Sequence, residues 1–249
     1  MTKSKVQKGK TFDRIVYTDF AFDMLRASVF IPEIQSSGNL IYRNLPDQWI
    51  KLFDGETNLI HVPEGAPPNI PVMQLSNKTG ELRLGVSRIR VDFELRSPNI
   101  EKPVEDVNSF FETAVNHIIE FADIFKLTIK RLATNTNRFV KQEDSGLYLS
   151  KHFCQERWWM EAPINRPEHF ELSTHKRFDL YEGLKVNSWV RNKTGKSTIT
   201  EESLIIVEQD INTLPEEMDI RKFSKKEIRR FFKHSIKELD HVLALYYPS

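Results

Sequence analysis

The sequence predicts an α+β fold built from two pseudo-repeats, each an antiparallel sheet followed by one long amphipathic helix packed on one sheet face. The tetrapeptide Asn-Lys-Thr-Gly occurs letter for letter at residues 77–80 and again at 192–195. Strand-like segments in each half lead to a helical segment with a pair of phenylalanines, at residues 110–111 and 231–232. Similar spacing of both features indicates an internal duplication. Independent core patterning of two unrelated halves is the alternative.

The first part of the chain alternates between apolar segments and breaks. Residues 20–34 predict an extended strand, and residues 45–53 predict a short helix with Trp49 on its apolar side. Residues 63–71 contain four prolines and a glycine, a composition that interrupts regular structure. We therefore expect a strand, a short helix and a long loop before the first Asn-Lys-Thr-Gly copy.

Each Asn-Lys-Thr-Gly copy is expected to form a hairpin turn, because Asn favours the first position of a type I turn and Gly accepts a positive φ after it. The return strand after the first copy, residues 86–96, alternates with a period of two. Its apolar face carries Ile89, Val91, Phe93 and Leu95, and its charged face carries Arg88, Arg90, Asp92, Glu94 and Arg96. This pattern indicates one face on a core and one face open to water or a partner.

Two long amphipathic helices are expected, over residues 104–125 and 224–246. Apolar residues recur at three and four positions in both segments. The stripe of the first is Val107, Phe111, Val115, Ile118, Phe121 and Phe125, and that of the second is Ile228, Phe232, Ile236, Leu239, Val242 and Tyr246. Ser224 and Glu227 have the spacing of a capping box, so the second helix should begin there.

Further strands are expected between the two helices. The polar second half of the first of them contains Asn135 and Asn137. The predicted segments are 127–140, 170–180, 184–191 and 204–211, with a turn at Gly183. One continuous sheet from both halves, with the helices side by side, would bury both stripes. The pseudo-repeats would then be residues 1–125 and 126–249, packed as one compact unit.

Composition excludes several classes of protein. The 36 basic and 35 acidic residues of the 249-residue chain give no basic excess of the kind that nucleic-acid binders show. The single cysteine, Cys154, excludes intramolecular disulfides and thiolate-rich zinc sites. No phosphate-binding glycine motif or Gly-x-Ser-x-Gly elbow occurs. Without an apolar leader or spanning segment, we expect a cytoplasmic protein that does not bind membranes.

Two groups of residues are candidates for metal binding or catalysis, and each also has a structural interpretation. His152, Cys154, His169 and His175 are close in sequence, but their spacing fits no zinc pattern. Cys154 beside aromatic residues is typical of a packing residue rather than a nucleophile. Asp92 and Glu94 share a strand face, as Mg²⁺ ligands do in nucleases. Their alternation with arginines favours a cross-strand charge ladder instead, so we expect no cofactor and no catalytic residues.

Candidate binding residues come from two segments. Trp158 and Trp159 lie in the loop-like segment 156–170, where one ring is expected to be exposed as a partner anchor or to pin an Ω-loop to the body. The charged strand face adds Arg88, Arg90, Asp92, Glu94 and Arg131. The amino-terminal arm carries Lys3, Lys5, Lys8 and Lys10, a basic segment able to touch phosphate or remain a solvated terminus.

Three segments together resemble a sporadically distributed family of uncharacterised bacterial proteins of about this size. They are the helix with Phe110 and Phe111, the strand 129–132 leading to Asn135 and Asn137, and the segment 209–212 before the last helix. The likeness covers most of the chain after residue 70. It implies an accessory role, such as defence against phage, and assigns no functional residues.

The sequence thus predicts a non-enzymatic cytoplasmic binding protein whose partner is another protein. A nucleic-acid-binding protein that uses the charged face and the basic arm is one alternative. A metal-dependent enzyme using Asp92 and Glu94 or the His152 region is another. An internal repeat already supplies the twofold arrangement that many proteins obtain by dimerising, which favours a monomer.

Overall fold

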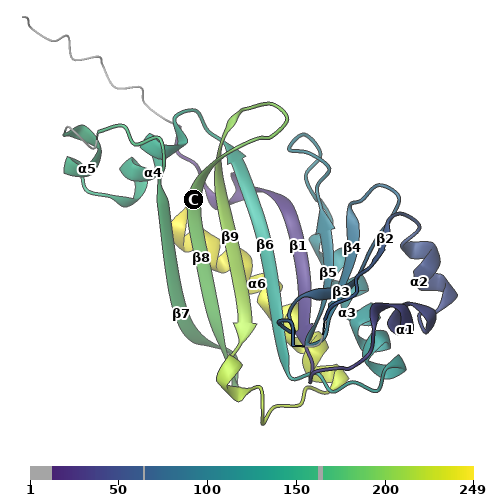
Figure 1. Cartoon of the computed structure of the whole chain (residues 1–249). Coiled ribbons are helices and arrows are strands. Elements are labelled where there is room, and N and C mark those ends of the chain that lie inside the picture. Colours follow the sequence, from purple (N-terminus) through teal and green to yellow (C-terminus); the bar gives the residue numbers. More distant parts are fainter. Residues whose placement is uncertain (1–12, 64, 162–164) are drawn as a thin grey trace, which may run out of the picture.

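The computed structural model describes residues 13–63, 65–161 and 165–249. Lys3, Lys5, Lys8 and Lys10, the predicted basic arm, lie outside these residues. The chain forms one antiparallel sheet with the strand order β2-β3-β4-β5-β1-β6-β9-β8-β7. Figure 1 views this sheet from its open face, with α3 and α6 behind the strands. The predicted α+β class and the single continuous sheet are confirmed.

The elements follow one another in a simple order. The strands are β1 (Ala21–Phe30), β2 (Thr57–Leu59), β3 (Pro71–Ser76), β4 (Leu82–Ser87), β5 (Arg90–Arg96), β6 (Arg131–Lys141), β7 (Glu171–Tyr181), β8 (Leu184–Lys196) and β9 (Ser203–Thr213). The helices are α1 (Gly38–Arg43), α2 (Asp47–Leu52), α3 (Val107–Ile124), α4 (Ser145–Phe153), α5 (Arg157–Met160) and α6 (Lys225–Tyr246). Short 3₁₀ turns occupy Tyr17–Asp19 and Pro215–Glu217.

The two long helices begin where side chains cap them. The Ser224 hydroxyl accepts a hydrogen bond from the Glu227 amide, and the Glu227 carboxylate accepts one from the Ser224 amide. This confirms the predicted capping box at α6. Asp106 caps α3 by accepting from the Ser109 amide at 2.9 Å. Both helices then cover the same face of the sheet, α3 over β1 and β5 and α6 over β6, β7 and β9.

The main core lies under α3. Trp49 of α2 is fully buried, and its ring centroid is 5.4 Å from that of Phe93 and 6.0 Å from that of Phe121. The two helices meet through Phe111 and Phe232, whose ring centroids are 6.1 Å apart. The predicted apolar stripes therefore face the sheet and each other.

A second apolar cluster lies near the end of α6. It joins Phe20 and Tyr247, whose ring centroids are 4.6 Å apart, to Leu149 of α4. The Tyr17 amide donates to the Tyr247 carbonyl at 2.9 Å. This cluster fixes both ends of the described chain against one edge of the core.

The second Asn-Lys-Thr-Gly copy does not form a turn, so that prediction is wrong. The first copy does turn between β3 and β4, with Gly80 at a φ of +74°. The second copy continues β8, where Thr194 pairs with Ile205 and Gly195 with Leu204 of β9. Long-range strand pairing overrides the local turn preference there, and the β8–β9 connection begins only after Lys196.

Residues 86–96 do not form the single return strand that their alternation predicts. The chain turns after Ser87, ending β4 and starting β5 at Arg90. The Ser87 hydroxyl accepts a hydrogen bond from the Ile89 amide at 3.4 Å, and the Ile31 amide donates one to the Ile89 carbonyl at 3.0 Å. Arg88 therefore lies in this turn, bonded to Glu33 and to the Ala66 carbonyl, and not on the open sheet face.

Candidate functional site

The open face of the sheet carries one row of cross-strand neighbours that runs from β4 to β7. Each member is paired in register with the next across two adjacent strands, so the side chains stand side by side. The row is Arg83, Glu94, Arg26, Asn135, Asp210, Trp189 and His175. It joins the predicted Glu94 and the metal-ligand candidate His175 to five residues that the sequence did not predict as binding residues: Arg26, Arg83, Asn135, Trp189 and Asp210.

In the first half of this row Arg26 and Glu94 form an ion pair, whereas Arg83 Nε donates to the Gly80 carbonyl at 2.9 Å. Glu94 accepts from Arg26 Nε at 2.7 Å and from Arg96, and its side chain is only 9% exposed. Burial raises the pKa of Glu94, but hydrogen bonds and charge from Arg96 and Arg26 outweigh that effect and hold the pKa below its usual value. Asp92 is likewise held by Arg90 at 2.8 Å and by the Ser28 hydroxyl at 2.6 Å.

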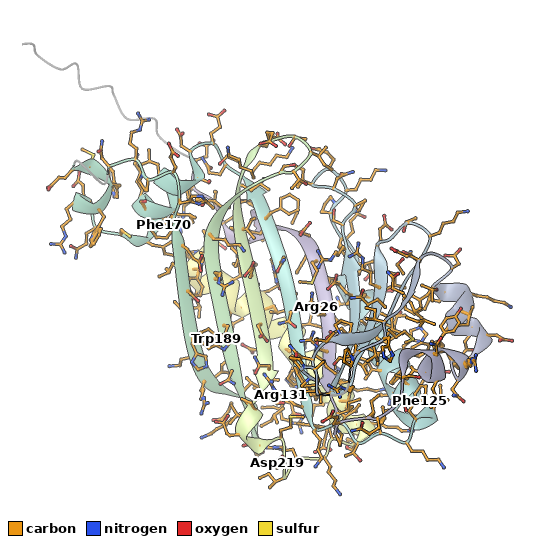
Figure 2. The ribbon with its side chains drawn as sticks, in the orientation of Figure 1. Arg26, Phe125, Arg131, Phe170, Trp189 and Asp219 are labelled. Carbon is orange, nitrogen blue, oxygen red and sulfur yellow. The ribbon has the colours of Figure 1, made fainter. Side chains whose placement is uncertain are left out.

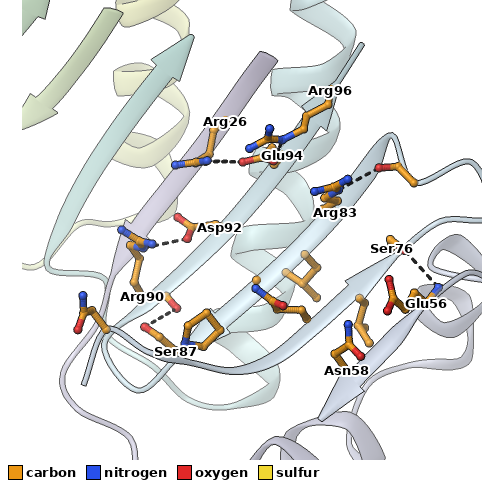
Figure 3. A pocket seen from close by; sticks show the side chains of 17 residues that line it. Arg26, Glu56, Asn58, Ser76, Arg83, Ser87, Arg90, Asp92, Glu94 and Arg96 are labelled. Atoms are coloured by element: carbon orange, nitrogen blue, oxygen red, sulfur yellow. Dashed lines mark hydrogen bonds and ion pairs between the residues drawn. The ribbon is translucent and has the colours of Figure 1, made fainter. Parts of the chain in front are cut away.

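These paired groups border the first cavity of the open face, about 390 Å³ in volume. Figure 3 shows Arg26 and Arg96 on either side of Glu94, with Arg90 against Asp92. The structure thus places the predicted Arg90, Asp92 and Glu94 together. Because both carboxylates already hold arginine partners, their arrangement is the predicted charge ladder rather than an open ligand set for Mg²⁺.

A central cavity of about 580 Å³ adjoins the first one and shares Arg26 and Arg96 with it. Its lining comes from β1, β5, β6, β7, β8 and β9 and is mostly polar. The residues are Met24, Arg26, Arg96, Asn135, Asn137, Ser173, Trp189, Arg191, Glu208, Gln209 and Asp210. Figure 2 shows Arg26 and Trp189 on the same face of the sheet. This cavity lies in the middle of the open face.

Trp189 is the exposed aromatic residue of this cavity. It lies opposite His175 in the β7–β8 pair, and the two rings stack with centroids 4.2 Å apart and an interplanar angle of 18°. The Trp189 residue remains 46% exposed. His175 Nε2 lies 3.1 Å from Asn187 Oδ1, which holds the imidazole in place. A large aromatic ring is therefore rigidly supported yet open to a ligand.

Asp210 lies beside Trp189 across the β8–β9 pair. It accepts a hydrogen bond from Asn212 Nδ2 at 2.9 Å, and within the described part of the chain it has no ion-pair partner within 4.0 Å. Burial raises the pKa of Asp210, and this is partly opposed by hydrogen bonds from Asn212 and Asn135 and by the charges of Arg131 and Arg26. The carboxylate is thus held in a partly dry position without a direct cation.

Arg131, another predicted binding residue, lies on the same face below the cavity. Its guanidinium donates to Asn212 Oδ1 at 2.8 Å and to the Thr213 carbonyl at 3.1 Å. It also lies over the Phe30 ring, 4.4 Å from the centroid. Burial lowers the pKa of Arg131 from its usual value. These contacts make Arg131 a support of the Asn212–Asp210 pair.

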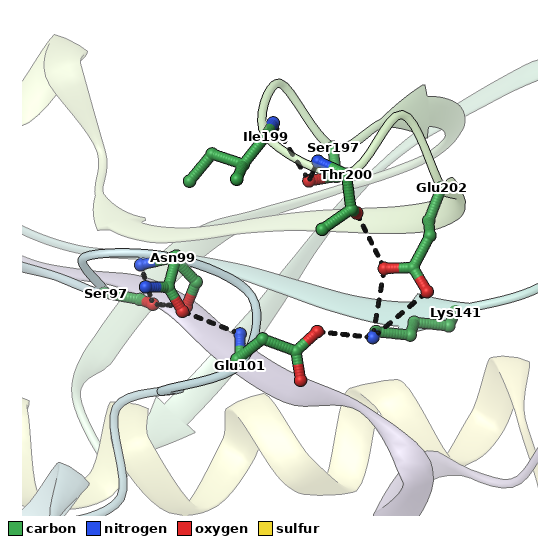
Figure 4. Close-up of polar contacts among 8 residues, drawn as sticks. All are labelled: Ser97, Asn99, Glu101, Lys141, Ser197, Ile199, Thr200 and Glu202. Carbon is green, nitrogen blue, oxygen red and sulfur yellow. Dashed lines mark hydrogen bonds and ion pairs between the residues drawn. The ribbon is translucent and has the colours of Figure 1, made fainter.

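A third cavity, of about 340 Å³, continues the open face toward the loops after β5 and β8. It shares Asn137 and Glu208 with the central cavity and adds the apolar side chains of Phe139, Ile199 and Ile206. Lys141 Nζ bridges Glu101 at 2.6 Å and Glu202 at 3.0 Å, tying these loops together (Figure 4). The three cavities form one trough across the sheet.

The candidate metal ligands from the sequence are not brought together. His152 Nε2 contacts the Tyr246 carbonyl, His169 Nδ1 contacts Thr194, and His175 stacks on Trp189. Cys154 follows α4 as its C-terminal cap. Across residues 13–63, 65–161 and 165–249, no group of three or more His, Cys, Asp or Glu side chains is arranged to hold a metal ion.

Trp158 and Trp159 lie on α5, away from the trough. Trp158 is 51% exposed, and Trp159 lies 4.9 Å from Lys151 Nζ, measured to the ring centroid. One exposed ring of the pair agrees with the sequence interpretation. The role of either ring as an anchor stays a prediction.

The chain matches no protein-family model and no curated protein. Among the described helices, none is long and apolar enough to cross a membrane.

Proposed function

We propose that this chain is a non-enzymatic binding protein that holds a polypeptide partner on the open face of its sheet. The central cavity carries the proposal, because it places the supported but exposed ring of Trp189 among paired charged groups. Trp and Arg are enriched among the residues that dominate protein interfaces. The sequence predicts an anchor at Trp158 and Trp159, whereas the central cavity favours Trp189.

Charge balance favours a polypeptide over a nucleic acid. The first and central cavities are lined by five arginines and five carboxylates: Arg26, Arg83, Arg90, Arg96 and Arg191 with Glu56, Asp92, Glu94, Glu208 and Asp210. Phosphate binding draws its affinity from cations that release counterions. Most of these arginines already form ion pairs with carboxylates, so they would contribute little affinity for phosphate. A polypeptide with both signs of charge fits the face better.

An internal duplication is part of the same proposal. The central strands β1 and β6 pair with each other, and outward from them β5, β4 and β3 on one side match β9, β8 and β7 on the other. A long helix follows each set, and Phe111 meets its counterpart Phe232. The two Asn-Lys-Thr-Gly copies do not support the duplication, because one is a turn and the other a strand. A cytoplasmic location and an accessory role in defence stay predictions from the sequence.

The proposal is tested by comparing two exposed tryptophans in the full chain. Trp189→Ala should abolish recovery of a stoichiometric protein partner in affinity purification from the native host, whereas Trp158→Ala should retain it. The reverse result would return the anchor to α5. Recovery of nuclease-sensitive material, with an excess of absorbance at 260 nm and a steep salt dependence, would instead establish the nucleic-acid alternative.

A further inference from the structure

We infer that the central cavity receives an arginine side chain of the partner, stacked on Trp189 and paired with Asp210. This inference rests on the proposed function and names the group that the open face recognises. It depends on three features of the cavity: a carboxylate with no ion-pair partner among residues 13–63, 65–161 and 165–249, an aromatic ring with one covered face, and amides next to both.

Asp210 differs from the other carboxylates near it. Glu94 is held by Arg26 and Arg96, and Glu208 is held by Arg191 and Lys193. The side chains that donate to Asp210 are the neutral amides of Asn212, at 2.9 Å, and of Asn135. Ionised carboxylates that are partly removed from water are normally paired with a cation. A cationic ligand would supply the partner that Asp210 lacks.

Trp189 is oriented for such a ligand. His175 covers the β7 side of the indole, while Asp210 stands on its β9 side, where the cavity lies. A planar guanidinium stacks on an aromatic face and is attracted by the negative ring face. Its parallel N–H groups form two hydrogen bonds with one carboxylate. A guanidinium between Trp189 and Asp210 satisfies both contacts together.

The amides of the cavity suit the remaining donors of a guanidinium, which carries five N–H groups and no acceptor. Asn135 pairs in register with Asp210, and Asn137 lies in the next open-face position of β6. The Asn137 side chain forms no hydrogen bond with another described residue. The Asn135 amide nitrogen donates to Asp210, which leaves the Asn135 amide oxygen as an acceptor, and the Asn137 amide offers a second acceptor oxygen when it turns toward the ligand. A lysine ammonium has no flat surface to stack and would use this arrangement less well.

The arginines around the cavity do not prevent a cationic ligand. Arg26 and Arg96 share Glu94, and Arg191 lies 3.1 Å from Glu171 and 2.9 Å from Glu208. Their charges are largely neutralised before the ligand arrives. Of the two carboxylates that line this cavity, Glu208 forms ion pairs, whereas Asp210 forms none with the described residues.

The direct test titrates the full chain with N-acetyl-arginine amide and follows the Trp189 indole N–H by NMR. We expect a saturable shift that becomes at least about tenfold weaker in Asp210→Asn, because a charge-assisted bidentate pair is lost. N-acetyl-lysine amide should bind several-fold more weakly. Equal binding of both amides, or no effect of Asp210→Asn, would overturn the inference. Tighter binding of guanosine, another planar donor-rich group, would also overturn it.

Matched controls separate this inference from the proposed function. Asp123→Asn makes the same chemical change on exposed α3, where an ion pair contributes little, and should leave the titration unchanged. If the partner is lost by Trp189→Ala but fully retained by Asp210→Asn, the arginine inference fails while the proposed function stands. If both variants retain the partner, both proposals fail. Burial raises the pKa of Asp210, so Asp210→Asn should not lower the melting temperature at neutral pH.

Discussion

The two halves of the sheet are covered on one face by similar helices but differ in what lies beneath them. Under α3 the contacts are apolar, with Phe93, Phe111 and Phe121 each about 1% exposed. Under α6 several contacts are polar. Thr134 and Ser235 share a hydrogen bond of 2.7 Å, and Gln209 Nε2 donates to the Leu239 carbonyl at 2.8 Å.

The open face of the sheet also differs between the two halves: its charged groups are paired in the first half, and an aromatic ring is exposed in the second. In the first half the carboxylates of Asp92 and Glu94 are bound by arginines. In the second half Trp189 is exposed and Asp210 has no direct cation among the described residues. Apolar burial contributes more net stability than exchanging water for protein hydrogen bonds. We therefore propose that the first half mainly stabilises the fold and that the second half binds the ligand.

The largest expected effect is on the apolar core of the first half. Phe93→Ala should lower the free energy of unfolding by about 3–5 kcal/mol, because it leaves a cavity among buried rings. Phe93 contacts Trp49 at 5.4 Å and His117 at 5.5 Å between ring centroids. Urea unfolding followed by circular dichroism measures the loss. Phe93→Leu, which keeps most of the volume, serves as the control, and a loss below about 1 kcal/mol in Phe93→Ala would remove the contrast between the halves.

A smaller effect is expected for the ion pairs of the first half. Glu94→Gln should cost about 2 kcal/mol at neutral pH, because Arg26 and Arg96 lose a carboxylate that is mostly shielded from water. The pKa of Glu94 is held below its ordinary value of 4.5, so this stability is present above pH 4.5 and is lost as the pH falls through the lowered pKa. Urea unfolding of parent and variant across this range should show the two converging in acid. If the difference in the free energy of unfolding between parent and variant stayed constant with pH, the charge of Glu94 would not be the cause of the lost stability.

One sequence period predicted several long elements of the fold, although residues 86–96 are an exception because the chain turns between β4 and β5. The stripes of α3 and α6 and the alternation of β7 follow directly from burial on one face. The second Asn-Lys-Thr-Gly copy could not be placed in this way. Its turn preference is local, whereas its pairing with β9 depends on strands that the tetrapeptide does not contain.

The candidate site could be predicted only in part for a similar reason. Arg90, Asp92 and Glu94 lie on one strand, so alternation placed them on one face. The exposure of Trp189 could have been predicted from the sequence. Its position alternates with Val186 and Val190, which are buried, and so falls on the polar face of β8. Its approach to Asp210 depends on the register of the β8–β9 hairpin, which the pattern of either strand alone does not determine, and the approach of Asn135 depends on the pairing of β9 with the distant β6.

The smallest expected effect tests the polar layer under α6. Thr134 and Ser235 are both fully buried; their hydroxyls share a hydrogen bond, and Ser235 Oγ also donates to the Phe232 carbonyl at 3.1 Å. Ser235→Ala alone should cost about 1–2 kcal/mol, because it leaves the Thr134 hydroxyl without that partner. Thr134→Val combined with Ser235→Ala removes both polar groups with little change of shape, so the double variant should be within about 0.5 kcal/mol of the parent or more stable.

A double-mutant cycle by urea unfolding measures this coupling. Recovery of stability in the double variant would show that the polar layer under α6 contributes little net stability, in contrast to the rings under α3. If the double variant instead loses as much as Phe93→Ala, the polar layer stabilises the second half as strongly as apolar packing stabilises the first. The division between a stabilising half and a binding half would then rest on the open face alone, where arginines pair with Glu94 but no cation of the described chain pairs with Asp210.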